Sequence, residues 1–466
     1  MKTLVSPNER LLEQYLWYAG KENMFEFASL RPTAFMVREA CDNGELVFNT
    51  FTGELILLEP NEAEAVFTLD GAESAGMTGL KRALSSRAFL IPKSFDEFGF
   101  IDELRFISEL KNKRGDFRNK YYIYTTTGCN ARCYYCFEEG VYARSMSRET
   151  ALKTADYIID NSGGHRLFLT WFGGEPLYNS EVIDIICERL QSSGCEFESI
   201  IKSNGYLFEK ERIALYKQKY RLSFVQIPLD GIEGAYNSTK AYIDVPEGID
   251  PYLRVIDNIL ALLENGVKVD IRLNIGPNNV QDLSPILFEL KSRFSSFANF
   301  AVYPQVLNEG ASNAFSIDER RRLFEAQKNA YVYCLENGIK LARGRYSLPV
   351  FKLHSCLADD PCAAGILPEG LLCKCPENPN TTHIFGNVFE AAGNESSAEK
   401  AVFYEKHDWK SCRLCPFYPN CVNLRLCAAR GRECDEFHRD FRLWKVRRIM
   451  REIAENAYSI GLSSSM

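Results

Sequence analysis

The sequence lacks three features that would point to export, a membrane or a nucleic-acid partner. Residues 1–14 are polar where a secretory signal would carry an apolar core. No apolar run approaches the length of a membrane span. The 55 Lys and Arg residues are outnumbered by 62 Asp and Glu residues, and the net charge of −7 gives no general attraction to nucleic acid. We therefore expect a cytoplasmic protein that binds neither membranes nor nucleic acids.

Cysteine, in contrast, is abundant and unevenly placed. The chain has 466 residues, of which 46% are hydrophobic and 25% charged, and this predicts a soluble protein of two or three globular domains. Sixteen residues are cysteines, three of them within 129–136 and nine within 356–434. Cytosolic proteins seldom keep disulfides, so this pattern favours metal or cluster ligation.

The first cysteine group is a short loop with the spacing C-x3-C-x2-C. It consists of Cys129, Cys133 and Cys136 and follows an apolar run, 121–124, that is typical of a strand. Three thiolates can hold three irons of a [4Fe–4S] cubane and leave the fourth iron open to a substrate or cofactor. A structural zinc site is the alternative, but zinc usually takes four ligands, and no nearby His or Cys completes the loop.

This spacing resembles the cluster-binding signature of the radical S-adenosylmethionine (SAM) enzymes. One strand–helix unit later, Gly173, Gly174, Glu175 and Pro176 resemble the GGEP motif with which that family holds the amino group of SAM. Strands and helices alternate about six times over 116–345. We therefore expect an α/β fold, a partial (β/α)6 TIM-type barrel, with ligands at the carboxyl ends of its strands.

Polar residues at the ends of further strands extend the predicted site. Arg272 and Asn274 lie near the end of the predicted strand 267–275. The resemblance implies that SAM is bound by Tyr135, Gly173, Gly174, Glu175, Pro176, Ser203, Asn204, Asp230 and Arg272. The polar residues among these could instead be turn or cap formers. Near Asp230, Pro228 and Tyr236 replace the Ser and His that are usual in the family, so no SAM role is carried over to them.

The second cysteine group lies in a segment, 346–436, that is too rich in Pro, Gly and Asn to build a large apolar core. Its C-x2-C pair is also typical of structural zinc. The order of its cysteines resembles the SPASM domain, which binds two auxiliary [4Fe–4S] clusters. The resemblance assigns Cys356, Cys362, Cys375 and Cys427 to the cluster nearer the barrel, and Cys412, Cys415, Cys421 and Cys434 to the farther one.

The SPASM pattern is not matched everywhere. Five residues separate Cys421 from Cys427 where three are usual, so Cys427 is the least secure ligand. Without Cys427, one iron of the nearer cluster would lack a protein ligand. Cys373 is either a spare thiol or an alternative ligand. Residues 437–466 are expected to form a closing helix.

Residues 1–115 predict a separate α+β domain. Strands are expected at 35–41, 45–49 and 54–59, with a hairpin turn at Asn43-Gly44, and helices at 60–69, 77–86 and 95–110. The segment 46–59 resembles the winged-helix-like domains with which radical SAM enzymes capture the leader of a ribosomally made peptide as an added strand. The alternative is a cap that only shields one end of the barrel.

The resemblance covers nearly the whole chain and implies three [4Fe–4S] clusters, one that cleaves SAM and two auxiliary. Cleavage of SAM gives a 5′-deoxyadenosyl radical, which removes hydrogen from an unactivated carbon of the substrate. The first hypothesis is a peptide maturase similar to the sactipeptide and ranthipeptide synthases, which forms a crosslink from a Cys sulfur. Its partners would be a precursor peptide and an electron donor such as flavodoxin or ferredoxin.

Two other hypotheses remain open. An anaerobic sulfatase maturase, which makes formylglycine, is disfavoured because Pro376 stands where that family has an acidic base after the cysteine. A non-enzymatic metal-binding or electron-transfer scaffold has no need of the loop at Gly173 to Pro176. The sequence identifies neither a general base nor the substrate.

Overall fold

The computed structural model describes residues 1–19, 30–67, 75–112, 117–136, 138, 140–307, 315–342, 344–351, 360–375, 384–390, 410–421 and 435–463. Within these residues, no helix is both long and apolar enough to cross a membrane.

A nine-stranded sheet in the order β12-β11-β10-β9-β8-β7-β13-β14-β15 forms the centre of the protein. Its parallel strands are β7 (Lys120–Thr126), β8 (Leu167–Gly173), β9 (Phe197–Lys202), β10 (Leu222–Leu229), β11 (Lys268–Ile275), β12 (Phe300–Val306) and β13 (Ala363–Ile366). The last two strands, β14 (Leu371–Cys373) and β15 (Ile384–Asn387), are antiparallel. The predicted α/β fold with a mainly parallel sheet is confirmed.

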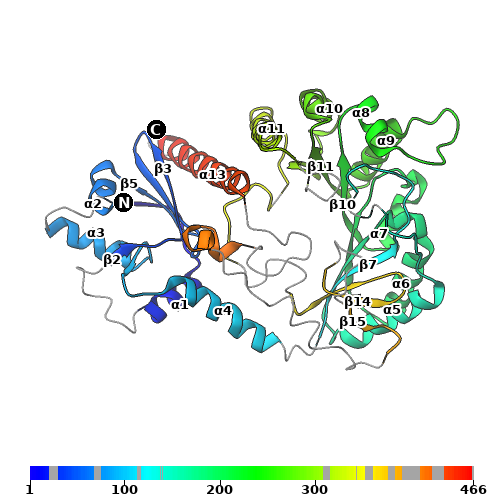
Figure 1. Cartoon of the computed structure of the whole chain (residues 1–466), viewed down its shortest axis with the longest axis horizontal. Helices are drawn as coiled ribbons and strands as arrows, with labels where there is room; N and C mark the ends of the chain where they lie inside the picture. Colours follow the sequence, from blue (N-terminus) through cyan, green and yellow to red (C-terminus); the bar gives the residue numbers. More distant parts are fainter. Residues whose placement is uncertain are drawn as a thin grey trace.

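Helices cover the outer side of this sheet (Figure 1). They are α5 (Arg148–Asn161), α6 (Ser180–Ser192), α7 (Ile213–Lys219), α8 (Glu233–Lys240), α9 (Pro251–Glu264), α10 (Leu283–Phe294) and α11 (Ile317–Glu336). Helices α5, α6 and α7 lie on the side away from the N-terminal part, and α11 lies nearest to it (Figure 1). Neither α8 nor α10 was predicted from the sequence.

The two faces of the sheet differ, and strand β10 shows how. Val225, Ile227 and Leu229 are buried beneath the helices and belong to the main apolar core. Gln226 and Pro228 alternate with them on the opposite, half-exposed face. A parallel sheet needs cover on both sides, so the open inner face is the side that is available to a ligand.

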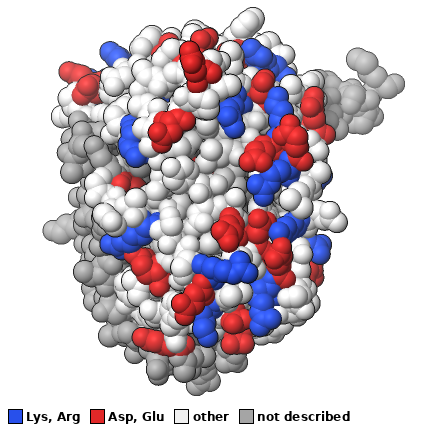
Figure 2. Space-filling model, turned by 90° about the vertical axis from the view of Figure 1, so that its right-hand side faces the viewer, with Lys and Arg blue, Asp and Glu red and all other residues white. Residues whose placement is uncertain are grey.

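The outer side carries charges of both signs. Figure 2 shows Lys and Arg intermixed with Asp and Glu on this face. Some of them pair between neighbouring helices, as Arg189 Nε of α6 does with Asp156 Oδ1 of α5 at 2.9 Å. Such exposed pairs contribute at most about 1 kcal/mol each to the stability of the fold. The fold therefore does not depend on them.

The N-terminal part contains a four-stranded antiparallel sheet in the order β1-β5-β4-β3. Its strands are β1 (Lys2–Val5), β3 (Met36–Cys41), β4 (Gly44–Asn49) and β5 (Leu55–Leu58), and its helices are α1 (Glu9–Ala19), α2 (Pro60–Phe67), α3 (Ala75–Ser85) and α4 (Glu97–Asn112). A second small sheet pairs β2 (Leu30–Pro32) with β6 (Leu90–Pro92). The meander of β3 to β5 follows the expected pattern, whereas β1, which pairs with β5, was not expected.

The last helix, α13 (Glu436–Ser463), returns to this N-terminal sheet (Figure 1). Its buried Val446 and Met450 pack with Leu46 and Phe48 of β4 in one apolar cluster. The Nε atom of Arg447 also donates to the backbone carbonyl of Arg38 in β3 at 3.1 Å. The two ends of the chain therefore build one unit together, which the sequence did not predict.

Replacing Met450 by Ala tests this packing. Met450 is fully buried against the sheet, so we expect a loss of about 2–5 kcal/mol in the free energy of unfolding because a cavity is left behind. Asn456→Ala, at an exposed position of the same helix, should change stability by less than about 0.5 kcal/mol. Chemical denaturation measures both, and equal effects of the two substitutions would contradict the packing.

Candidate functional site

The three-cysteine loop leaves the carboxyl end of β7 and is held at its start and in its middle by backbone hydrogen bonds. Near its start, Thr127 N donates to Arg144 O at 2.8 Å. In its middle, Arg132 N donates to Lys240 O at 2.8 Å, and Asn130 O accepts from Ile243 N at 2.9 Å. Segments distant in sequence therefore fix the backbone that carries the thiols.

Cys129, Cys133 and Cys136 are half-buried free thiols. Burial raises the pKa of Cys129 to about 12, with the Glu175 carboxylate as the next contributor, and burial also raises the pKa of Cys136 to about 11. Such thiols need a strong cation to become thiolates, and bound iron supplies one. Three thiols on one loop fit the donor set of a [4Fe–4S] cluster with one open iron.

Within the described part of the chain, no three His, Cys, Asp or Glu side chains are placed to bind one metal ion. A cubane cluster does not need such a single-ion site, because each thiolate binds a different iron.

The loop at Gly173 and Gly174 lies against the cysteine loop. Gly174 N donates to Thr126 O, and Glu175 N donates to Gly128 O, each at 3.0 Å. A Cβ atom on Gly173 would lie 2.1 Å from Thr126 O, and one on Gly174 would lie 2.4 Å from Gly128 O. Gly173 also has a φ of +119°, so only glycine permits this contact between the two backbones.

The Glu175 carboxylate ties the same loop to the end of β9. Its side chain is buried and accepts hydrogen bonds from Leu177 N at 3.2 Å, Ser203 Oγ at 2.9 Å and Asn204 N at 2.8 Å. Burial raises the pKa of Glu175 to about 7. The sequence predicted that Glu175 pairs with the ammonium of SAM. In the structure, both oxygens of its carboxylate accept hydrogen bonds from groups of the protein.

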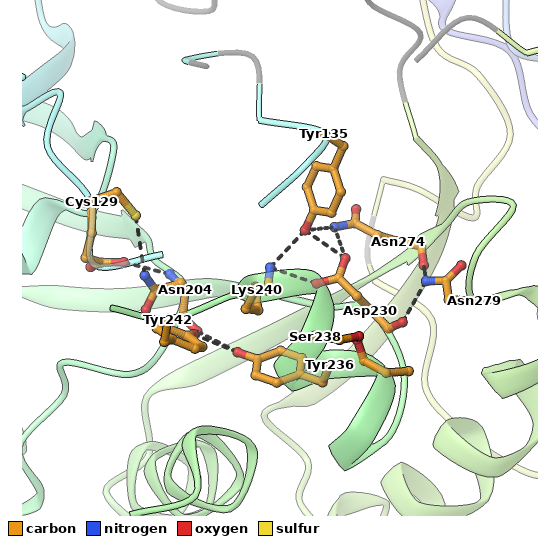
Figure 3. A network of polar contacts seen from close by, with 12 residues as sticks. Cys129, Tyr135, Asn204, Asp230, Tyr236, Ser238, Lys240, Tyr242, Asn274 and Asn279 are labelled. Atoms are coloured by element: carbon orange, nitrogen blue, oxygen red, sulfur yellow. Dashed lines mark hydrogen bonds and ion pairs between the residues drawn. The ribbon is translucent and has the colours of Figure 1, made fainter. Parts of the chain in front are cut away.

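Asn204 joins Glu175 to the cysteine loop (Figure 3). Its side-chain Nδ2 donates to Asn130 Oδ1 at 2.7 Å and lies 3.8 Å from Cys129 Sγ. The structure thus brings the predicted residues Glu175, Ser203 and Asn204 together beside Cys129. Their contact with SAM remains a prediction.

A second polar network lies on the other side of the loop (Figure 3). The Tyr135 hydroxyl donates to Asp230 Oδ1 at 2.7 Å and accepts from Lys240 Nζ at 2.9 Å and Asn274 Nδ2 at 3.1 Å. Lys240 Nζ also forms an ion pair with Asp230 Oδ2 at 2.8 Å. Burial raises the pKa of Tyr135 well above its usual value, followed by the effect of Asp230, so the phenol keeps its proton and donates it.

Two further residues support this network. Asn279 Nδ2 donates to Asp230 O at 2.7 Å and to Asn274 O at 2.8 Å, which fixes the ends of β10 and β11 together. Sequence reasoning missed both Lys240 and Asn279. The only available signal for Lys240 was its position ten residues after Asp230, which does not reveal that its side chain turns inward.

Arg272 lies apart from this network. It is level with Pro228 of β10 and Tyr303 of β12, two residues before Asn274. Its buried Nε atom has no hydrogen-bond partner among the described residues. The contact of Arg272 with SAM remains a prediction.

The cysteines of the second group lie in two places. Cys362 precedes β13 at the amino end of β7, where its carbonyl accepts from Lys120 N at 3.1 Å, and Cys375 follows β14. Cys412, Cys415 and Cys421 instead pack against apolar clusters of the N-terminal part. These are the two groups into which the resemblance divides the cysteines; the clusters themselves remain predictions.

Of the other predicted ligands in this region, some lie within the described residues and some lie outside them. Cys373 is buried, with its Sγ 3.8 Å from the carbonyl of Cys375. Cys356, Cys427 and Cys434 lie outside the described residues. Strands β13 to β15 extend the central sheet, so part of the segment predicted as a separate domain continues the barrel sheet.

Comparison with protein families identifies the class of this site. The family model of the Radical SAM superfamily matches residues 123–290, from within β7 to within α10. The chain therefore contains a radical SAM domain, and the members of this superfamily are enzymes.

A curated relative matches a limited part of the chain. Fe-coproporphyrin III synthase from Methanosarcina barkeri is 28% identical over 169 residues, which cover 35% of this chain and 39% of the synthase. The chain spans less than half the length of the curated relatives it matches.

Two solved structures share the fold over a larger part. Native anSMEcpe with bound AdoMet and Kp18Cys peptide is 14% identical, with a TM-score of 0.56 over 72% of this chain and 99% of that chain. Streptococcus suis SuiB is 14% identical, with a TM-score of 0.50 over 87% of this chain and 99% of that chain. At these identities the likeness shows the fold alone.

Replacing Gly174 by Ala tests the contact between the two loops. The added methyl group would meet the backbone at Gly128, so the cysteine loop must move, at a cost of about 1–3 kcal/mol. We expect a lower melting temperature and less iron and sulfide bound after anaerobic reconstitution.

Gly234→Ala is the matched control. A Cβ atom there meets nothing within 4 Å, and alanine is a better helix former than glycine by about 1 kcal/mol. Gly234→Ala should keep its iron content and should not lower the melting temperature. A Gly174→Ala protein that behaves in the same way would refute the close contact.

Proposed function

We propose that this chain is a radical SAM maturase that crosslinks a ribosomally made precursor peptide. One observation carries the proposal: the three-thiol loop is hydrogen-bonded through its backbone to the Gly174 and Glu175 loop at the carboxyl ends of β7 and β8. A thiol loop of a zinc or electron-transfer scaffold would not require this second loop.

The cofactor-binding residues follow from this arrangement. Cys129, Cys133 and Cys136 would hold a [4Fe–4S] cluster. Glu175, Ser203 and Asn204, of which Asn204 reaches Cys129, would contact a bound SAM. When bound, cluster and SAM supply a 5′-deoxyadenosyl radical that takes a hydrogen atom from carbon. The chain's own part is to hold the reacting groups in place and exclude water.

A peptide substrate is supported by the fold and by the N-terminal sheet. The anSMEcpe structure that shares the fold holds a peptide together with AdoMet. In this chain, β1 occupies the outer side of β5, so β3 forms the other edge of the sheet. An edge strand can pair with an extended peptide through its backbone. Because α13 already contacts Arg38 and Glu39, we propose that the leader peptide binds at the Ala40 end of β3.

The outward-facing groups of β3 can be assigned. The carbonyl of Arg38 accepts from a side chain of α13 and therefore points away from β4. In an antiparallel strand, alternate residues share this direction, so the N–H and C=O groups of Ala40 also point outward. Ala40 is exposed, and its N–H group is a donor that a peptide strand could use.

The crosslink that we propose joins a Cys sulfur of the peptide to a carbon. One hydrogen atom leaves the carbon with the 5′-deoxyadenosyl group, and the thiol loses a proton to solvent. One electron then remains to be removed from the product, and an auxiliary cluster held by the second cysteine group would supply a one-electron acceptor. Cys362 and Cys375 border β13 and β14 of the same sheet, at the amino end of β7 and thus opposite the cysteine loop. This group is the candidate for the acceptor.

Mass spectrometry of the small peptide encoded beside this gene tests the function. With reconstituted enzyme, SAM and a reductant, we expect a product lighter by two hydrogens, with fragmentation blocked between a Cys and its partner. Cys133→Ala should abolish SAM cleavage, whereas Cys195→Ala, a half-buried thiol beyond the end of α6, should not.

The other outcomes separate the alternatives. Conversion of a Cys or Ser to an aldehyde, with no crosslink, would indicate a formylglycine-forming enzyme. SAM cleavage without any change in the peptide would reject the hypothesis that the enzyme modifies this peptide. Zinc without sulfide in the purified protein would indicate a scaffold.

Ala40→Pro tests the docking edge. Proline removes the outward N–H group without a change in the β3–β4 ladder, so we expect the affinity for the leader peptide to fall by about fivefold, the loss of one hydrogen bond of ~1 kcal/mol. Ala40→Val keeps the N–H group and should bind as the unmodified protein does. Fluorescence anisotropy of a labelled leader measures both, and equal affinities would place the leader elsewhere.

A further inference from the structure

Lys240 is a buried cation whose role is not explained by the predicted cofactor contacts. It is the last residue of α8, and its side chain is buried together with that of Asp230. A charged pair loses its hydration when it is buried, so it persists only where its remaining hydrogen bonds are satisfied. The contacts of Lys240 therefore need a structural explanation.

These contacts hold the cysteine loop on both sides of Cys133. On the amino side, the backbone carbonyl of Lys240 accepts from Arg132 N at 2.8 Å. On the carboxyl side, its Nζ donates to the Tyr135 hydroxyl at 2.9 Å and lies 5.5 Å from the centre of the Tyr135 ring. In Figure 3, Lys240 lies between Asn204, which reaches Cys129, and Asp230.

The chain after Lys240 is shaped to reach the same loop. Ala241 has a φ of +45°, a left-handed conformation that costs a non-glycine residue about 1–2 kcal/mol. This turn ends α8 and lets Ile243 N donate to Asn130 O at 2.9 Å. The strained turn is compensated by contacts with the cysteine loop.

The opposite end of the ion pair is rigid. Asp230 follows β10 and is held by Tyr135 and by Asn274 Nδ2 at 2.9 Å. Asn279 fixes the backbone of Asp230. The side chain of Lys240 thus links the loop to the ends of two strands of the barrel.

Lys240 also sets the charge around the thiols. Its buried ammonium lies 2.9 Å from the hydroxyl of Tyr135, which follows Cys133 by two residues in the loop. A cluster held by three thiolates is anionic, and a nearby buried cation stabilises its more reduced, more negative state.

We propose that Lys240 is a positioning residue for the iron–sulfur cluster, which holds the loop on both sides of Cys133 and favours the reduced cluster through its charge. The inference rests on the proposed function only in assuming that the loop binds a cluster. It does not depend on the identity of the substrate.

The test compares Lys240→Met, Lys240→Arg and Asp230→Asn in the full chain. The first readout is the midpoint potential of the reconstituted cluster bound by Cys129, Cys133 and Cys136. The change that SAM causes in the EPR spectrum of this cluster distinguishes its signal from signals of the second cysteine group. Lys240→Met should shift the potential to more negative values because a positive charge is lost. Asp230→Asn should shift it to more positive values because a negative charge is lost, and Lys240→Arg should stay near the unmodified protein.

The second readout is the rate at which iodoacetamide alkylates Cys133 in the cluster-free protein. Lys240→Met should increase this rate by about tenfold or more, because one partner of a buried pair is removed and the loop opens. Lys210→Met is the control, since Lys210 pairs with Asp257 at the surface at 3.4 Å and should change neither readout.

Shifts of the potential in the same direction for Lys240→Met and Asp230→Asn would overturn the electrostatic role, because a merely loosened fold moves both alike. An unchanged alkylation rate in Lys240→Met would overturn the positioning role. If Lys240→Met does not fold by circular dichroism, Asp230→Asn and Lys240→Arg still decide the charge effect. An unmodified protein that binds no iron rejects the proposed function, while the alkylation assay still tests how Lys240 holds the loop.

Discussion

The position of the whole site depends on the close approach of two backbones, one after β7 and one after β8. Gly173 and Gly174 permit hydrogen bonds from the second loop to Thr126 and Gly128, where any side chain would collide with a carbonyl oxygen. The start of the three-cysteine loop is therefore fixed relative to Glu175. Glu175 in turn holds the end of β9 through Ser203 and Asn204. The carboxyl ends of β7, β8 and β9 are therefore fixed relative to one another.

Two polar networks extend this geometry to either side of the loop. Buried Glu175 and Asn204 hold the side of Cys129, and buried Asp230 and Lys240 hold the side of Cys133. Buried polar groups are costly when they lose their hydrogen bonds, so these contacts favour one arrangement of the loop. A radical reaction requires such fixed positions, because the reactive group must meet a single carbon atom.

Much of the fold could be predicted because its signals are local. Alternating apolar strands, turn-forming glycines and capping residues such as Asp250 before α9 lie within a few residues of one another. Cys129, Cys133 and Cys136 share one short loop, so their spacing alone indicated a common ligand. The packing of α13 on β4, the pairing of β1 with β5 and the extension of the sheet by β13 join distant segments, and no local pattern encodes them.

The sequence by itself determined the chemistry of the donors: three thiols on one loop, followed by two glycines and a carboxylate. Only the tertiary structure decided where the charges lie. It turned Glu175 toward Ser203 and Asn204, and it brought Lys240 from the end of α8 to Tyr135. The physical reason is that the direction of a side chain depends on the segments that pack around it, and those segments are brought together only when the whole sheet forms.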